Sequence, residues 1–323
     1  MKLYLVIPCF NEEEVLPETA RRTRDKLREL AEKGKISSDS KICFVDDGSK
    51  DKTWEIIERL CKEDRAFCAL KLSRNKGHQN ALLAGLMSVK ENCDAAISLD
   101  ADLQDDVNAI DAMVDKFNEG CDVVYGVRSS RKSDRMFKRT TARAFYRLMR
   151  AMGVETVYDH ADYRLMSKRA IEALAEFKEV NLFLRGIVPL IGYKSDTVLY
   201  ERNKRFAGKS KYPLKKMFTF ALEGITSMSI KPIRMITTTG FLIFLVSLGM
   251  LIYSFIRHLT GNTVAGWTSI VVSVWAIGGI QLLAMGVIGE YVGKIYLESK
   301  HRPKYLIEIK KNFDEDDDDN GKE

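Results

Sequence analysis

Along the first 200 residues, short apolar runs alternate with longer stretches in which apolar residues recur every three or four positions. The short runs are typical of buried strands, and the longer stretches have the spacing of amphipathic helices. This alternation predicts an α/β fold with a mostly parallel sheet covered by helices on both faces. The predicted strands are Leu3–Pro8, Ile42–Asp46, Ala69–Leu72, Ala95–Asp100 and Asp122–Val127, and the predicted helices lie near residues 12–33, 52–64, 78–91, 106–119 and 135–152.

Two long apolar stretches dominate the last third of the chain. Met235–Ile256 contains 22 residues without a charge, and a second uncharged stretch has its apolar core at Trp267–Gly289. As helices rising about 1.5 Å per residue, each would extend about 30 Å, the thickness of a bilayer core. A buried hairpin of a soluble protein would also be apolar, but two such lengths in series favour two transmembrane helices.

Basic residues flank these two stretches on one side only. Eight lysines and arginines lie within residues 204–234 and six within residues 294–311, whereas the connecting loop has only Arg257 and His258. The positive-inside rule therefore predicts a multi-pass protein of the plasma membrane with both termini in the cytoplasm. Tyr212–Ile230 is amphipathic at helical spacing, so it would be either a core helix or, as its position beside a span favours, a helix at the membrane interface.

Composition and charge narrow the class of protein. The chain has 323 residues, of which 46% are hydrophobic and 30% charged, which excludes a disordered or collagen-like protein. Its last ten residues hold seven acids and one lysine, so the preceding 313 residues carry a formal net charge of +12 against +6 for the whole chain. The acidic tail reads as disordered. The six cysteines form no CxxC pair, so we expect buried, reduced thiols.

Polar motifs follow three of the predicted strands. Ligands of open parallel sheets bind beyond the carboxyl ends of the strands, so these motifs are expected to share one site. Two carboxylates separated by one residue on a turn can share Mg²⁺ or Mn²⁺ with substrate phosphates. The motifs are Pro8-Cys9-Phe10-Asn11-Glu12, Val45-Asp46-Asp47-Gly48-Ser49 and Asp100-Ala101-Asp102-Leu103-Gln104. Asp51, close to the second motif, reads better as a cap of the following helix.

Two more motifs follow the strand-end motifs along the chain. They are Arg205-x-x-Gly208-x-Ser210-Lys211 and the segment from Gly289 to Tyr296 that closes the second apolar stretch. Together with the strand-end motifs, over residues 2–305, they resemble the family-2 glycosyltransferases of the polyprenyl-phosphate type, the group of the dolichol-phosphate mannose synthases and bactoprenol glucosyltransferases. The resemblance implies a GT-A nucleotide-sugar-binding domain (1–210), an amphipathic juxtamembrane helix (211–234), a two-helix transmembrane hairpin (235–292) and a cytoplasmic C-terminal segment with a disordered acidic tail (293–323).

The resemblance also implies roles for individual residues. Mg²⁺ or Mn²⁺ would be bound by Asp100, Asp102 and Gln104, and the catalytic residues would be Asp102, Asp162 and Arg205. Asp162 matches the acid of the family's Gly-Asp-Phe-Arg motif, with Ala161 in place of glycine, and could steer the acceptor, bind metal or act as a base. The nucleotide-sugar site would comprise Pro8, Phe10, Glu12, Val45, Asp47, Asp100, Ala101, Asp102, Gln104, Arg128, Arg205 and Lys211.

Several basic residues have two readings each. For Arg164 a role in the site and a structural ion pair with a neighbouring acid are both open. His78 and His160 are expected at a helix start or in a loop rather than as metal ligands, because no partner histidine or cysteine has metal spacing. Lys138 and Arg139 could contact the acceptor phosphate or form a solvated helix face.

The implied reaction is inverting transfer of a sugar from a nucleotide sugar to a polyprenyl (undecaprenyl) phosphate on the cytoplasmic leaflet. UDP-glucose and UDP-N-acetylglucosamine are favoured as donors over GDP-mannose. One alternative is a processive polysaccharide synthase, which usually has a Gln-x-x-Arg-Trp motif and more spans. The other is a non-catalytic nucleotide-sugar-binding membrane scaffold, which would not need the metal motif. The expected partners are donor, acceptor and lipid bilayer, with a homo-oligomer left open and no nucleic acid.

Overall fold

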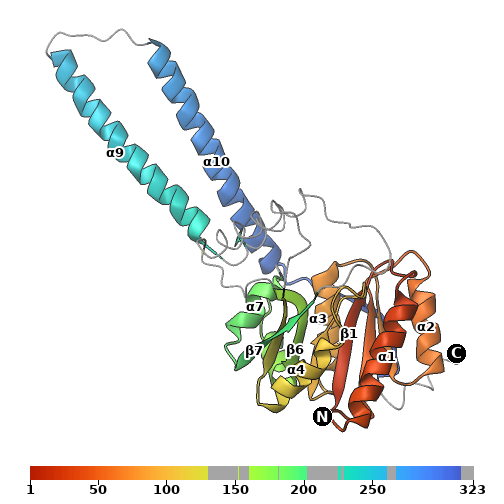
Figure 1. Ribbon diagram of the computed structural model, residues 1–323. Coiled ribbons are helices and arrows are strands. Elements are labelled where there is room, and N and C mark those ends of the chain that lie inside the picture. The colour runs from red at the N-terminus through yellow and green to blue at the C-terminus, as the bar shows by residue number, and fades with distance from the viewer. Residues whose placement is uncertain are drawn as a thin grey trace.

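The computed structural model describes residues 1–129, 152, 160–180, 182–201, 225–226, 229–259 and 267–313. Within these residues the strands form one sheet of order β7-β5-β6-β4-β1-β2-β3-β8 (Figure 1). The strands are β1 (Leu3–Cys9), β2 (Lys41–Asp46), β3 (Phe67–Leu72), β4 (Ala95–Ser98), β5 (Val123–Arg128), β6 (His160–Ser167), β7 (Ser195–Tyr200) and β8 (Ile307–Lys311).

The sheet is mostly parallel, as the sequence predicts. β1 pairs in parallel with β2 and β4, β2 with β3, and β5 with β7. β6 lies antiparallel between β4 and β5, and β8 is antiparallel to β3 at the edge. The five predicted strands correspond to β1–β5, with ends shifted by up to two residues. No strand is predicted from the sequence at the segments that form β6, β7 and β8.

Helices cover both faces of the sheet. Alternate residues of β1 point to opposite faces: Leu3, Leu5 and Ile7 belong to one buried cluster, and Tyr4 and Val6 belong to the other. The first cluster packs beneath α1, α2 and α4, and the second beneath α3, α6 and α7. These helices are α1 (Leu16–Glu32), α2 (Thr53–Glu63), α3 (His78–Val89), α4 (Ala109–Asn118), α6 (Lys168–Ala175) and α7 (Leu184–Leu190). The helix predicted near residues 135–152 lies outside the described residues, except for Met152.

The six cysteines lie inside this domain. All are free and buried, as expected from their lack of metal or disulfide spacing. Burial raises the pKa of Cys61 and Cys93 to about 12 each, so these two thiols stay protonated at neutral pH.

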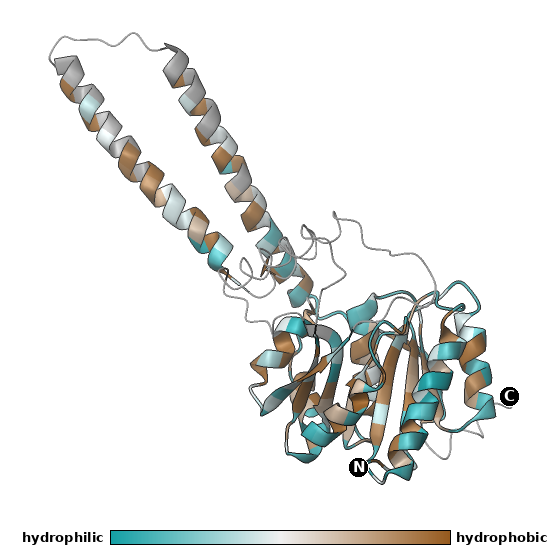
Figure 2. Cartoon of the chain, viewed as in Figure 1, coloured by the Kyte–Doolittle hydropathy of each residue, from teal (hydrophilic) through white to brown (hydrophobic). Residues whose placement is uncertain are grey.

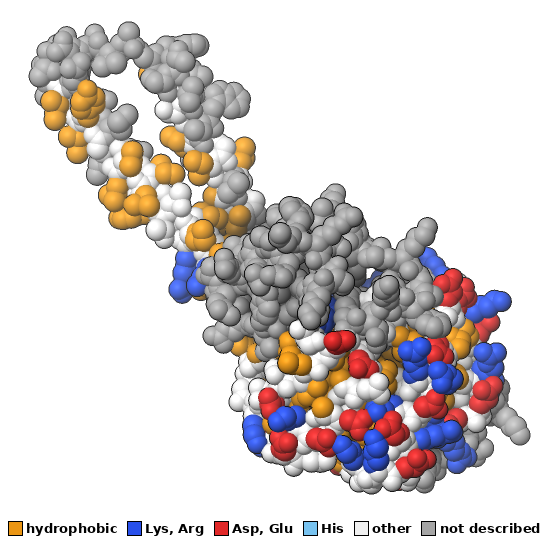
Figure 3. Space-filling model, viewed as in Figure 1, with side chains coloured by type: hydrophobic (Ala, Val, Ile, Leu, Met, Phe, Trp, Pro, Cys, Tyr) orange, Lys and Arg blue, Asp and Glu red, His pale blue; other side chains and the backbone are white. Residues whose placement is uncertain are grey.

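Two long helices extend away from the α/β domain as a hairpin, α9 (Lys231–Leu259) and α10 (Trp267–Ser299) (Figure 1). Both are rich in apolar residues (Figure 2), and apolar side chains lie on their outer surface, whereas the domain carries mixed acidic and basic side chains (Figure 3). Within the described part of the chain, one stretch, Ile277–Ser299 of α10, is long and apolar enough to cross a membrane. The span predicted at α9 therefore stays a prediction. The interfacial helix predicted at 211–234 falls largely outside the described residues.

After α10 the chain returns to the α/β domain. The Oε2 atom of Glu298 accepts a hydrogen bond from the N–H of Val180 (2.8 Å), and Lys304 donates to the carbonyl of Phe177 (3.1 Å). β8 then pairs with β3, and Asn312 donates to the carbonyls of Cys61 (2.7 Å) and Phe67 (2.9 Å). The segment beyond the hairpin is thus part of the domain's own sheet. The acidic tail, residues 314–323, lies outside the described residues.

Candidate active site

The carboxyl ends of three neighbouring parallel strands bring the acidic motifs to one edge of the sheet. Pro8 and Cys9 of β1 are in register with Val45 and Asp46 of β2, and β4, which leads into Asp100, lies on the other side of β1. Pro8 and Val45 are buried, whereas Phe10 and Glu12 are half-buried in the loop beyond β1. The residues predicted to contact the nucleotide sugar on these loops therefore lie around one strand-end edge.

The loop after β1 is held against the loop after β2. Asn11, with a φ of 52°, receives a hydrogen bond on its Oδ1 atom from the N–H of Lys50 (2.9 Å), and its own N–H donates to the Ser49 hydroxyl (3.0 Å). The N–H of Glu12 donates to the hydroxyl of Thr53 (2.9 Å), the first residue of α2. Asp51 accepts the N–H of Thr53 at 3.0 Å, so it satisfies a donor at the start of α2, although the N-cap residue of this helix is Lys52 and not Asp51 as predicted.

Asp47 holds a third loop in place, the one that precedes α3. Its two carboxylate oxygens accept the N–H groups of Lys76 (2.7 Å) and Gly77 (2.9 Å), just before α3. Burial raises the pKa of Asp47, and these two hydrogen bonds oppose that effect. Gly48 has a φ of +68°, and a Cβ there would lie 2.6 Å from the Asn75 nitrogen, so only glycine fits. Asp47 thus has a structural role beside its predicted contact with the nucleoside.

The Asp100–Gln104 turn places two carboxylates beyond β4. The carbonyl of Ala101 accepts a hydrogen bond from the Thr19 hydroxyl (2.7 Å), and Asp102 Oδ1 accepts the N–H of Gln104 (3.1 Å). Leu103 between them has a φ of 56°. Burial raises the pKa of Asp100, and the neighbouring carboxylates of Asp162 and Asp102 add to this effect. A cation beside Asp100 would favour its charged form.

The donor set of this turn fits a metal shared with substrate. Within the described residues, no group of three or more histidine, cysteine, aspartate or glutamate side chains could hold a metal ion by itself. Mg²⁺ and Mn²⁺, however, commonly take one or two carboxylates and complete their shell with phosphate oxygens and water. Asp100 and Asp102 suit that arrangement, because a nucleotide diphosphate would bring the missing oxygens.

Asp162 on β6 is the centre of an ion-pair network. Its Oδ1 atom lies 2.8 Å from Arg164 Nη2 and 3.2 Å from Arg185 Nε, and its Oδ2 atom lies 3.0 Å from Arg185 Nη2. His78, the first residue of α3, has its Nε2 atom 3.5 Å from Asp100 and 3.8 Å from Asp162. Burial alone would raise the pKa of Asp162, but the two guanidinium groups outweigh it and hold the pKa well below its usual range.

Two predictions for individual residues can be checked against this network. Arg164 forms the ion pair with a neighbouring acid that one of its two readings anticipated. His78 begins a helix as expected, but it also bridges two site carboxylates, a contact that is not predicted from the sequence. Arg185 was missed altogether, because a single arginine in a short helix carries no motif.

Arg128 lies in a second network beside the Asp100–Gln104 turn. Its Nε atom lies 3.4 Å from the hydroxyl of Tyr200, and that hydroxyl donates to Asp105 Oδ1 at 2.5 Å. Arg128 Nη2 is 3.7 Å from the same carboxylate oxygen. Burial raises the pKa of Asp105 to about 6. Asp105 could have been identified as a third acid after the same strand, whereas Tyr200 on β7 gives no signal in the sequence.

Some predicted site residues cannot be placed. Arg205 and Lys211, assigned to the donor phosphates, lie outside the described residues, as do Lys138 and Arg139. Their roles stay predictions.

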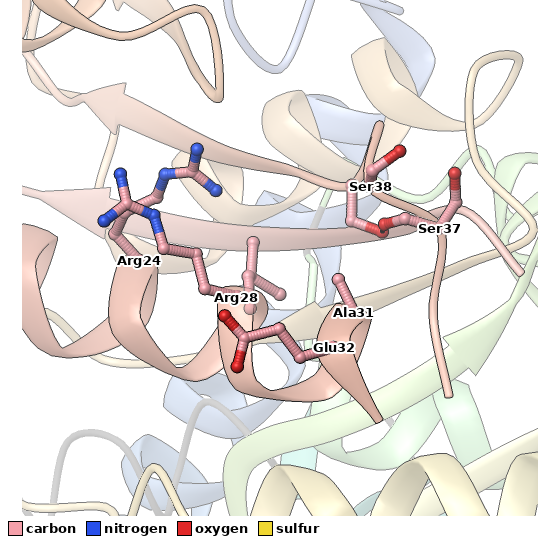
Figure 4. Close-up of a pocket in the computed structure, with 8 residues that line it drawn as sticks. Arg24, Arg28, Ala31, Glu32, Ser37 and Ser38 are labelled. Carbon is pink, nitrogen blue, oxygen red and sulfur yellow. Dashed lines mark hydrogen bonds between the residues drawn. The ribbon is translucent and has the colours of Figure 1, made fainter. Parts of the chain in front are cut away.

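A separate cavity of about 210 Å³ lies far from the acidic motifs. It is lined by Arg24, Arg28 and Glu32 of α1 and by the loop that follows the helix (Figure 4). Ser40 of this loop accepts the N–H of Leu3, the first residue of β1, so the cavity lies at the amino ends of the strands. It is not the site that the motifs predict.

Comparisons with known proteins define the class of the chain. Residues 4–175 match the model of glycosyl transferase family 2, and the chain belongs to this family. Its relatives include the uncharacterized glycosyltransferase YkoT of Bacillus subtilis (strain 168), 54% identical over 95% of this chain and 91% of the relative. The bactoprenol glucosyl transferase of Shigella phage SfV is 40% identical over 96% of this chain and 99% of its own length. The protein is therefore a family-2 glycosyltransferase of the polyprenyl-phosphate type, as its motifs predict.

Solved structures resemble the domain more distantly. Mannosyl-3-phosphoglycerate synthase from Rubrobacter xylanophilus is 16% identical, with 69% of this chain and 71% of that chain covered and a TM-score of 0.46. Glucosyl-3-phosphoglycerate synthase from Mycobacterium tuberculosis is 15% identical, with 70% of this chain and 78% of that chain covered and a TM-score of 0.44.

Proposed function

We propose that the protein transfers glucose from UDP-glucose to a polyprenyl phosphate, such as undecaprenyl phosphate, with inversion at the anomeric carbon. The observation that carries the proposal is the 40% identity to a bactoprenol glucosyl transferase over 96% of the chain. The gathering of Asp47, Asp100 and Asp102 at one strand-end edge supports it, because a nucleotide diphosphate and its cation need such a site.

The donor would lie across the strand ends. Pro8, Phe10, Glu12, Val45 and Asp47 would surround the nucleoside, and the turn from Asp100 to Gln104 would face the diphosphate. A bound Mg²⁺ or Mn²⁺ would supply positive charge that stabilises the departing diphosphate. Arg128, Arg205 and Lys211 would contribute further cationic hydrogen bonds to phosphate oxygens.

The transfer itself needs little proton chemistry. An oxygen of the acceptor phosphate attacks C1 of the glucose, the bond between C1 and the diphosphate oxygen breaks, and its electron pair leaves with UDP. A phosphate monoester has a second pKa near 6, so the acceptor is largely dianionic at neutral pH and attacks without a general base. The chain's principal task is to hold two anionic substrates together, which requires fixed positive groups.

The membrane helices would hold the domain where the acceptor is found. α9 and α10 are proposed to span the plasma membrane as a hairpin, with the domain at the cytoplasmic leaflet. Ile277–Ser299 supports the second span by its length and composition. Because Glu298 in the last turn of α10, together with Lys304 and β8 after it, attaches this part of the chain to the domain, the phosphate headgroup of a membrane-anchored acceptor could approach the strand-end edge.

A panel of radiolabelled donors tests the proposal. The purified full-length protein is incubated with undecaprenyl phosphate, Mg²⁺, and UDP-glucose, UDP-N-acetylglucosamine or GDP-mannose. Labelled lipid is expected from UDP-glucose, and chelation with EDTA is expected to stop its formation. Labelled lipid from another donor alone would correct the sugar, and no labelled lipid from any donor would contradict the proposed function.

A further inference from the structure

The two arginines that bind Asp162 differ sharply in their access to solvent. The side chain of Arg164 is 2% exposed, and that of Arg185 is 32% exposed. Arg164 also donates to the carbonyl of Leu184 (3.3 Å), so it ties β6 to the start of α7 and lies within the protein. Arg185, the next residue of α7, is the guanidinium of this pair that a ligand could reach.

The elements around Arg185 hold it in place. The N–H of Leu184 donates to the Oε1 atom of Gln79 on α3 (2.9 Å), and the Ser98 hydroxyl donates to the backbone carbonyl of Asp162. Asp162 is itself largely buried, with a side-chain exposure of 13%, and it contacts Arg185 through both carboxylate oxygens. A guanidinium held by two hydrogen bonds to one carboxylate has a fixed plane and loses little rotational freedom when it binds a ligand.

Arg185 lies close to the Asp100–Gln104 turn. His78 lies between the two acidic groups, 3.5 Å from Asp100 and 3.8 Å from Asp162. The carboxylate that binds Arg185 is thus separated from a predicted metal-binding carboxylate by one imidazole ring. A phosphate group bound beside Asp100 would need positive charge on its other side.

We infer that Arg185 is a phosphate-binding residue of the transfer site and that Asp162 is the positioning residue that presents it, rather than a base. This inference rests on the proposed function, because it takes the phosphates to be those of the donor or of the acceptor. The Oδ1 atom of Asp162 accepts from two arginines and its Oδ2 atom from Arg185, so a proton on this carboxylate would displace cationic partners. The dianionic acceptor phosphate has already lost its protons, so no base is needed to remove one.

The first test compares two arginine variants that each lose an ion pair with an aspartate. Arg185→Gln should weaken phosphate binding about 10- to 100-fold, because it removes hydrogen bonds to a charged group. Arg169→Gln is the control. Arg169 binds Asp122 through Nε (3.2 Å) and Nη2, and Asp122 lies just before the amino end of β5, away from the carboxyl ends of the strands where the acidic motifs lie. UDP affinity with Mg²⁺ measures the donor side, and the KM for farnesyl phosphate measures the acceptor side. Arg185→Lys should restore part of the loss, because it keeps the charge without the planar fork.

A double-mutant cycle tests the role of Asp162. If Asp162 acts through Arg185, the double variant Asp162→Asn with Arg185→Gln should be no worse than the more impaired single variant. If the losses of the two single variants multiply in the double variant instead, Asp162 acts independently of Arg185, which would overturn its positioning role. Unchanged UDP affinity and unchanged KM in a folded Arg185→Gln variant would overturn the role of Arg185. Wild-type protein without transfer would instead contradict the proposed function, and UDP affinity would still report on Arg185.

Discussion

At the scale of single residues, the pair Asp47–Gly48 shows how backbone geometry and chemistry constrain each other. Asp47 accepts the N–H groups of Lys76 and Gly77, which draws the loop at 74–77 onto the turn after β2. That close approach leaves no room for a side chain at position 48, where a Cβ would lie 2.6 Å from the Asn75 nitrogen and 2.7 Å from the Arg74 carbonyl carbon. The loop that leads into α3 and His78 therefore depends on a glycine.

Gly48→Ala should accordingly be much more destabilising than Gly34→Ala. Both glycines have a φ of +68°, but a Cβ at position 34 would have no atom within 4 Å. Gly34→Ala measures the cost of the backbone conformation, about 1 kcal/mol, whereas Gly48→Ala adds about 1–3 kcal/mol for the overlap. Chemical unfolding in detergent would measure both free energies. Equal values would show that the loop at 74–77 moves aside without cost.

Asp102→Asn should reduce transfer about 10²–10³-fold while the protein stays folded, because it removes the charge that is proposed to face the metal and almost no volume. Asp106→Asn is the control, since Asp106 lies on the same loop but caps the N–H of Asn108. Turnover of UDP-glucose in Mg²⁺ is the measurement. Near wild-type turnover of Asp102→Asn would remove Asp102 from the metal site.

Which site residues can be predicted depends on how each is held. Asp47, Asp100 and Asp102 lie within four residues after strands whose apolar runs are plain in the sequence, and parallel pairing then brings the strand ends together. Arg185 and Tyr200 belong to α7 and β7, and their positions depend on long-range packing that no local pattern encodes. Sequence could supply the acids of the site, but not these two partners.

At the scale of elements, β6 joins β4 to β5 and so connects the two halves of the sheet, although no strand is predicted there from the sequence. It runs antiparallel between β4 and β5, so the residue order Asp162-Tyr163-Arg164 sends alternate side chains to opposite faces. Tyr163 packs in one core cluster and donates to the carbonyl of Asp106, whereas Asp162 and Arg164 face α3 and α7. The strand was missed because its polar residues interrupt the apolar pattern that identifies β1–β5.

The return of β8 to the sheet edge is a second element that depends on a few contacts. Asn312 has a φ of 60° and donates to the carbonyls of Cys61 and Phe67. Asn312→Ala should lower the free energy of unfolding by about 1–3 kcal/mol through the lost hydrogen bonds and a strained backbone. Asn312→Gly removes the same bonds but tolerates this φ, so it should lose less.

Hydrogen exchange in β3 would locate that effect. Amides of β3 that pair with β8 should exchange faster in Asn312→Ala, while amides of β1 should change little, because β1 lies two strands away. Unchanged exchange throughout β3 would show that β8 is held by its strand pairing and by Phe313, without help from Asn312.

At the scale of the whole molecule, the α/β domain is built from chain segments both before α9 and after α10. β8 and Phe313 lie after α10, and Phe313 packs in the same buried cluster as α3. A chain that ends at Arg234 would therefore lose an edge strand together with α9 and α10. From the sequence, residues 293–323 are predicted to form a cytoplasmic C-terminal segment that ends in an acidic tail. No strand is predicted there, because one short strand of alternating exposure has too weak a pattern to separate from a loop.

The decisive variant should consequently remove the hairpin and keep β8. In such a variant, a flexible Gly/Ser linker replaces residues 235–292, so that residues 293–313 can still reach the sheet. We expect UDP affinity close to that of the full chain, because every described residue of the proposed site lies within residues 1–201. Transfer to undecaprenyl phosphate in bilayers should fall by at least about 10²-fold, since the domain loses the high local concentration that anchoring provides.

A short, water-soluble prenyl phosphate should restore part of the activity of that variant, because it diffuses to the site without the bilayer.

The chain ending at Arg234 serves as the comparison: it should unfold at a lower temperature than the linker variant, because the edge of β3 is uncovered. If the linker variant keeps its circular dichroism spectrum but no longer binds UDP, α9 and α10 contribute to the donor site itself. The division of labour between a catalytic domain and a membrane anchor would then be wrong.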